Sequence, residues 1–155
     1  MSKKINVFLV LIIALATVLR IYQLSTESLF VDEAIVFWKS QGSVTDMVKF
    51  WFSGGHFPTY YIMMHYWVKI FGTSEAAVRF PSVIFGVLSI GLVFLLARRL
   101  FDEKIALVAS FFLALNTISI YYSQCARPYS ISTCFTILSF LTLLTAIRTT
   151  ASSPG

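Results

Sequence analysis

The chain has 155 residues, of which 57% are hydrophobic and only 12% are charged. Soluble domains carry about 25% charged residues, so this composition excludes an ordinary soluble domain and indicates a membrane protein. The net charge of +5 does not indicate a nucleic-acid partner, because the basic residues form no cluster that could follow a phosphate backbone.

The first apolar run extends from Ile5 to Leu19, between Lys3-Lys4 and Arg20. It is slightly short for a span of about 20 residues, but terminal lysine and arginine side chains extend its reach. A signal peptide is the alternative, since Ala14-Leu15-Ala16 resembles a cleavage site. We favour a retained transmembrane helix over residues 1–22, because Arg20 is typical of the outer edge of a membrane anchor.

Residues 23–78 are mixed in polarity and rich in aromatic side chains, which predicts interfacial helices within a large extracytoplasmic loop. A capping-box pattern at Ser43-Val44-Thr45-Asp46 begins one of these helices. Another is predicted from Thr59 to Phe71, with Pro58 at its start and Gly72 at its end.

Two adjacent carboxylates, Asp32 and Glu33, lie in the same loop. Acids at a membrane surface are costly to desolvate, so such a pair usually stays in water or carries out a function. A purely local interpretation also fits, because acids are favoured in the first turn of a helix. Ser28 would then be the N-cap of a helix from Leu29 towards Ser40.

Three further spans are predicted within residues 79–148, at Phe80 to Ala97, Ile105 to Tyr122 and Tyr129 to Ile147. Residues 149–155 form a polar tail, and we expect the chain to be truncated there. The predicted fold class is therefore all-α: a polytopic membrane protein with about four transmembrane helices and interfacial helices in one large outer loop.

Small and polar residues indicate where the spans meet. Ser82 and Gly86 form a small-xxx-small pair that lets another helix approach closely, and Cys134 is expected to be a small packing residue. The fourth span carries a stripe of hydroxyl residues, expected to contact several neighbouring helices: Thr133, Thr136, Ser139, Thr142 and Thr145.

The charges at the ends of the spans predict the orientation of the chain. With four spans, the basic residues that fall on one side are Lys3, Lys4, Arg98, Arg99, Lys104 and Arg148. The positive-inside rule makes that side cytoplasmic. The acidic pair at 32–33, His56 and Arg127 then share the opposite, extracytoplasmic side.

Five motifs follow one another in a distinctive order. The acidic pair follows the first span, and the others are His56-Phe57-Pro58-Thr59-Tyr60-Tyr61, Phe71-Gly72-Thr73-Ser74-Glu75-Ala76-Ala77-Val78-Arg79-Phe80-Pro81-Ser82, Arg98-Arg99-Leu100-Phe101 and Tyr121-Tyr122-Ser123-Gln124-Cys125-Ala126-Arg127-Pro128-Tyr129. This order resembles the N-terminal part of the protein-O-mannosyltransferase family, membrane-embedded glycosyltransferases of the GT-C class, to which bacterial aminoarabinose transferases are related.

Two positions depart from the pattern of that family. Phe57 stands where the family commonly has the first proline of His-Pro-Pro, and Cys125 stands where it commonly has the glutamate of Ser-Gln-Glu-Ala-Arg. The second departure removes a carboxylate that could supply a polar contact or a metal ligand.

The resemblance implies an integral enzyme of a prokaryotic plasma membrane. It would move a sugar from a polyprenyl-phosphate donor to a hydroxyl of a protein, lipid or glycan acceptor at the extracytoplasmic face. Family members are much longer and have more spans, so we expect this chain alone to be inactive. A non-catalytic membrane protein that binds or transports a lipid-linked sugar is the alternative, and a purely structural membrane subunit is a third interpretation.

The resemblance also implies roles for individual residues. Asp32 is the expected general base, and Glu33 would orient it, contact the acceptor or raise its pKa. Arg127 is the first candidate for the phosphate and Arg79 the second, although Arg79 would serve equally as an interface anchor. Further substrate-binding candidates are His56, Tyr60 and Tyr129.

No cofactor is firmly expected, and a divalent metal is the one that the resemblance leaves open. His56 is a weak candidate ligand, because a lone histidine without further ligands at metal-like spacing is more often a hydrogen-bonded residue.

Overall fold

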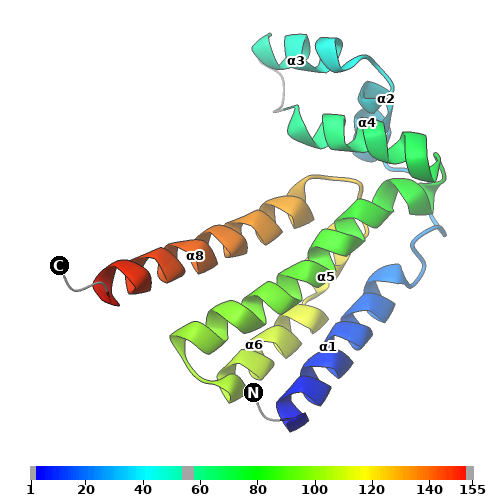
Figure 1. Cartoon of the computed structure of the whole chain (residues 1–155). Coiled ribbons are helices and arrows are strands. Elements are labelled where there is room, and N and C mark those ends of the chain that lie inside the picture. Colours follow the sequence, from blue (N-terminus) through cyan, green and yellow to red (C-terminus); the bar gives the residue numbers. More distant parts are fainter. Residues whose placement is uncertain (1–2, 54–57, 153–155) are drawn as a thin grey trace.

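The computed structural model describes residues 3–53 and 58–152, which contain helices and no strands. This is the all-α class that the sequence predicts. Figure 1 shows a helical bundle with three shorter helices at one end. The helices are α1 (Lys3–Ile21), α2 (Val31–Ser40), α3 (Val44–Phe52), α4 (Thr59–Phe71), α5 (Glu75–Leu100), α6 (Glu103–Leu115), α7 (Thr117–Ser123) and α8 (Tyr129–Ser152).

The long helix α5 is the axis of the bundle, because α1, α6, α7 and α8 all pack against it (Figure 1). Halfway along, Ile90 packs against Ala16 of α1 and Ala114 of α6. Near its end, Phe94 packs against Ala106 of α6. Alanine at these positions lets the helix backbones approach closely, as membrane helices require.

The third predicted span is not one continuous helix, so the prediction for Ile105 to Tyr122 is wrong on this point. Helices α6 and α7 meet at a bend of 60°. Asn116 lies at the bend, where its side chain accepts a hydrogen bond of 2.8 Å from the Ser119 N–H and caps the new helix α7. In the part of the chain that the structure describes, three helices are long and apolar enough to cross a membrane, and the bent pair makes up to four, in line with the predicted number.

Pro81 lies inside α5 and lacks the N–H that would bond the carbonyl of Ala77 four residues earlier. The indole of Trp67 replaces that donor, with its Nε1 at 2.8 Å from the Ala77 oxygen. Trp67 also stacks on Phe71 with 4.1 Å between ring centroids. The proline therefore creates the attachment point that holds α4 against the start of α5.

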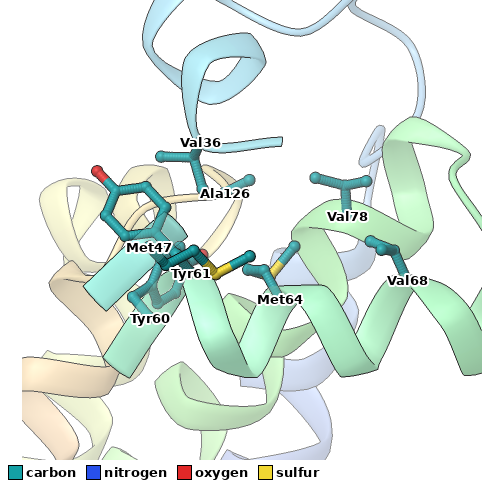
Figure 2. Packing of buried hydrophobic residues seen from close by; sticks show 8 residues of the cluster. All are labelled: Val36, Met47, Tyr60, Tyr61, Met64, Val68, Val78 and Ala126. Carbon is teal, nitrogen blue, oxygen red and sulfur yellow. The ribbon is translucent and has the colours of Figure 1, made fainter. Parts of the chain in front are cut away.

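Helices α2, α3 and α4 form a cap over one end of the bundle. Figure 2 shows its apolar cluster, in which Met64 and Tyr61 of α4 gather with Val36 of α2 and Val78 of α5. The predicted bounds of α4, Thr59 to Phe71 with Gly72 as C-cap, are confirmed. Ser43 also caps α3 as predicted, since its hydroxyl accepts from the Asp46 N–H at 3.1 Å.

Gly86 permits a close helix contact, as the small-xxx-small pattern predicts. A Cβ at this position would collide with Ser123 of α7 and would lie 3.2 Å from the Arg20 Nε. The hydroxyl stripe of α8 meets its prediction at Thr145, which accepts a hydrogen bond from Arg99 of the neighbouring helix α5. The members of the stripe are exposed, and Thr133 and Thr145 also donate to carbonyls of their own helix, at 3.0 and 2.7 Å.

Candidate functional site

The two adjacent carboxylates have different environments. Helix α2 begins at Val31 with Phe30 as its N-cap, so the expected cap at Ser28 is wrong. Successive residues on a helix lie about 100° apart, which separates the two acids. Glu33 is only 1% exposed, whereas the Asp32 side chain is 69% exposed.

Glu33 joins three parts of the chain through its carboxylate. Oε2 accepts from the Phe30 N–H at 3.0 Å, which caps α2, and Oε1 accepts from the Ala126 N–H at 2.6 Å. Arg79 donates to both oxygens, from Nε to Oε1 at 3.1 Å and from Nη2 to Oε2 at 2.8 Å. Burial alone would raise the pKa of Glu33, but these hydrogen bonds and the Arg79 charge hold that pKa below its ordinary value.

Arg79 is a structural residue in this arrangement. Besides Glu33, its guanidinium donates to carbonyls of the loop between α1 and α2: Leu24 at 2.9 Å, Glu27 at 2.9 Å and Ser28 at 3.1 Å. All five of its N–H groups therefore have acceptors within the chain, and none is left for a phosphate. Arg79 is therefore not placed for phosphate binding or for anchoring at the interface, the two expected roles. It is buried and holds the loop between α1 and α2 in place. The Glu33 carboxylate is likewise engaged by Arg79 and by the backbone N–H groups of Phe30 and Ala126, so it holds these parts of the chain together rather than orienting Asp32.

Arg127 follows directly in the loop that Glu33 holds. The Ser82 hydroxyl donates to the Arg127 carbonyl at 3.3 Å, so the backbone is anchored on both sides. The side chain is 27% exposed and lies with Nη1 at 3.6 Å from the Asp32 Oδ2. Its Nη2 donates to the Tyr129 hydroxyl at 3.3 Å. Within the described chain these partners leave further guanidinium N–H groups available to a ligand.

A pocket of about 460 Å³ opens beside Arg127, between the cap and the start of α8. Arg127 is the charged residue among its lining side chains, and the rest of the wall is largely apolar. That wall includes Ile131 and Phe135, which lie one helical turn apart on α8. A pocket with a cation at its rim and an apolar wall fits an amphiphilic anion. The lining residues are Val36, Thr59, Tyr60, Tyr61, Arg127, Pro128, Ile131, Ser132 and Phe135.

The remaining substrate-binding candidates, Tyr60, Tyr129 and His56, differ in where the structure places them. Tyr60 lines the pocket, but its hydroxyl is enclosed and makes no hydrogen bond within residues 3–53 and 58–152. Burial raises the pKa of Tyr60 well above its ordinary value, so it stays neutral. Tyr129 does not line the pocket, but its hydroxyl accepts the hydrogen bond from Arg127. His56 falls outside the described residues, so its metal role stays a prediction. Within the described residues, no three histidine, cysteine or acidic groups lie close enough together to hold a metal ion.

Sequence reasoning missed one buried arginine altogether. Arg20, expected at the outer edge of the first span, is fully enclosed by α1, α6 and α7. An ionisable residue within a predicted span is a signal in itself, because such residues are rare and require partners. What the sequence could not show is that those partners lie about a hundred positions later in the chain, at Leu113, Ala114, Ser119 and Ser123.

The helices are those of an integral membrane protein, and its pocket combines the Arg127 cation with a largely apolar wall. Residues 55–153 match the family model for dolichyl-phosphate-mannose-protein mannosyltransferase, so the chain belongs to this family of membrane glycosyltransferases. Comparisons with curated proteins and with solved structures gave no match. The matched segment contains Arg79 and Arg127 but not Asp32, which lies beside Arg127 in the structure.

Proposed function

We propose that this protein transfers a sugar from a polyprenyl-phosphate donor to an acceptor hydroxyl, with the donor phosphate at Arg127 and the prenyl chain along the apolar pocket. The observation that carries the proposal is the difference between three arginines. Arg20 and Arg79 use all their N–H groups inside the protein. Among residues 3–53 and 58–152, Arg127 keeps donors free at the rim of the pocket, and a planar guanidinium suits a phosphate.

Asp32 is the proposed general base. Its carboxylate is exposed and would accept the proton of the acceptor hydroxyl while that oxygen attacks the anomeric carbon. The bond from the anomeric carbon to the phosphate oxygen breaks, and its electron pair leaves with the lipid phosphate, whose charge Arg127 stabilises. The Asp32 Oδ2 and the Arg127 Nη1 lie 3.6 Å apart. A bound phosphate would take over Arg127 and free the carboxylate for proton transfer.

Substitution of Arg127 tests the donor site. Arg127→Ala should weaken binding of a polyprenyl phosphate in detergent micelles by roughly 10- to 150-fold, the worth of about 1.5–3 kcal/mol for hydrogen bonds to a charged group. Arg127→Lys should be intermediate, because an ammonium lacks the planar fork. Arg148→Ala, at the far end of α8, is the matched control. Unchanged affinity for Arg127→Ala would remove this residue from the site.

We further propose that the cap faces away from the cytoplasm. The basic ends of the spans lie together at the opposite end of the bundle, where Arg148 donates to the Arg99 carbonyl at 2.6 Å and Ile5 of α1 packs near Phe94. The positive-inside rule makes that end cytoplasmic. A cysteine introduced at Ser43 should react with an impermeant maleimide in intact cells, and one at Lys104 should not. The reverse pattern would overturn this orientation.

A further inference from the structure

We propose that Arg20 is a positioning residue, which holds the α6–α7 break and through it the loop that carries Arg127; its effect on donor binding rests on the proposed function. Arg20 is 0% exposed, and its partners are neutral oxygens rather than a carboxylate. Nη1 donates to the carbonyls of Ala16 at 3.3 Å and Ala114 at 3.2 Å. Nη2 donates to the Leu113 carbonyl at 3.3 Å and the Ser119 hydroxyl at 2.9 Å, and Nε to the Ser123 hydroxyl at 3.2 Å.

These partners are what a broken helix leaves behind. A helix that ends inside the bundle leaves its last carbonyls without intrahelical donors. These carbonyls need other donors, because the membrane core contains no water to bond them. The bend at Asn116 frees the carbonyls near the end of α6, and the guanidinium of Arg20 bonds two of them. A positive charge at a helix C-terminus is also favoured by the helix dipole. Arg20 is therefore the C-terminal cap of α6, supplied by another helix.

The same side chain is linked to the start of the loop with Arg127. Ser123, which accepts from Arg20, is the last residue of α7, and Gln124 follows it. The Gln124 amide donates to the Tyr22 carbonyl at 2.8 Å and to the Arg20 carbonyl at 3.4 Å. Two side chains thus hold this end of α7 to the end of α1, three to four residues before Arg127.

The close fit around this contact supports a specific position for α7. Gly86 of α5 allows Ser123 and Arg20 to reach it, and any larger residue would push both away. Isolated buried cations are costly, and a well-packed apolar residue would cap no carbonyl at this site. Arginine suits this position because its guanidinium has five N–H donors, one for each of the five oxygens around it.

The native Cys125 is a built-in reporter of the loop. It is buried at 7% exposure, and burial raises the pKa of its thiol, so it should react slowly with a maleimide. With Cys134→Ala as background, labelling in native membranes follows the opening of the loop without any substrate. Arg20→Gln should accelerate labelling of Cys125 by about tenfold or more, because the loop loses the contacts that keep it closed. Arg20→Lys should be intermediate, with three donors in place of five.

A control separates positioning from general loss of stability. Phe94→Ala removes a buried side chain from the same bundle, but its partner Ala106 lies near the start of α6, away from both the break and the loop. At a matched loss of thermal stability, it should leave the Cys125 labelling rate within about twofold of the unsubstituted rate. Equal labelling of Arg20→Gln and Phe94→Ala would overturn the inference. Binding of a polyprenyl phosphate, measured on the same variants, should fall only for the Arg20 substitutions. If the unsubstituted protein bound no polyprenyl phosphate, the proposed function would be contradicted but the labelling result would not.

Discussion

In the full-length protein, Asp32→Asn is expected to lower the rate of sugar transfer by about two to four orders of magnitude, the usual contribution of a positioned general base. Asparagine has the shape of aspartate but cannot accept a proton at neutral pH. Because the Asp32 side chain is 69% exposed and its ion pair with Arg127 spans 3.6 Å, the substitution should cost under about 1 kcal/mol of stability. Donor binding should therefore persist while turnover is lost, measured in native membranes with a lipid-linked sugar.

Glu27→Gln is the matched control, since Glu27 is an exposed acid in the preceding loop and should leave transfer unchanged. Near-normal transfer by Asp32→Asn would mean that this carboxylate only serves the first turn of α2. The same comparison decides between the two classes of function, because a protein that binds or transports a lipid-linked sugar without catalysis shows no transfer to lose.

Glu33→Gln should instead unfold the cap. Removing one partner of a buried ion pair leaves the other charge uncompensated, which costs about 3–5 kcal/mol. Arg79 would then lack its carboxylate, and the Ala126 N–H and Phe30 N–H would lose a charged acceptor. Thermal unfolding in detergent should show a loss of this size, against under about 1 kcal/mol for Asp32→Asn. Equal stability of the two variants would contradict the division of roles between these neighbours.

The pH dependence of stability tests the ion pair of Glu33 and Arg79 in a second way. Because the pKa of Glu33 is lower in the folded protein than in the unfolded chain, its contribution is fully present above the unfolded value of about 4.3. The contribution is lost as the pH falls through the lower folded value. The unsubstituted protein should therefore lose stability steeply below about pH 4, and Glu33→Gln should lack this part of the acid transition. An identical acid profile in both proteins would show that Glu33 is not the group that titrates.

Local signals were enough for much of the fold. The bounds of α4 followed from Pro58 and Gly72, the start of α3 from Ser43, and the close contact at Gly86 from its spacing with Ser82. Each of these depends on backbone geometry or size within a few residues of the chain. The long spans followed from apolar length alone, and the family from motifs whose order the match to residues 55–153 supports.

The candidate site was less accessible, because it depends on partners distant in sequence. Adjacent acids look equivalent in a sequence, and only the contacts of Glu33 with Arg79 and with the Ala126 N–H distinguish the buried acid from the exposed Asp32. Likewise, Arg79 and Arg127 both looked suited to phosphate until the loop carbonyls occupied one of them. The bend at Asn116 had a local signal, an N-cap residue inside an apolar run, but its stabilising partner Arg20 lies on another helix.

The most direct measurement of the central claim is photo-crosslinking with a polyprenyl phosphate that carries a photoreactive group near the phosphate end of its chain. Mass spectrometry of the labelled protein should place the adduct on the pocket wall, at Val36 or within Ile131 to Phe135. The adduct should be lost in Arg127→Ala, because the phosphate then has no cation at the rim. Labelling that is unchanged by Arg127→Ala, or that lies at the exposed Phe111 and Phe112 of α6 instead, would contradict the assignment of this pocket to the donor.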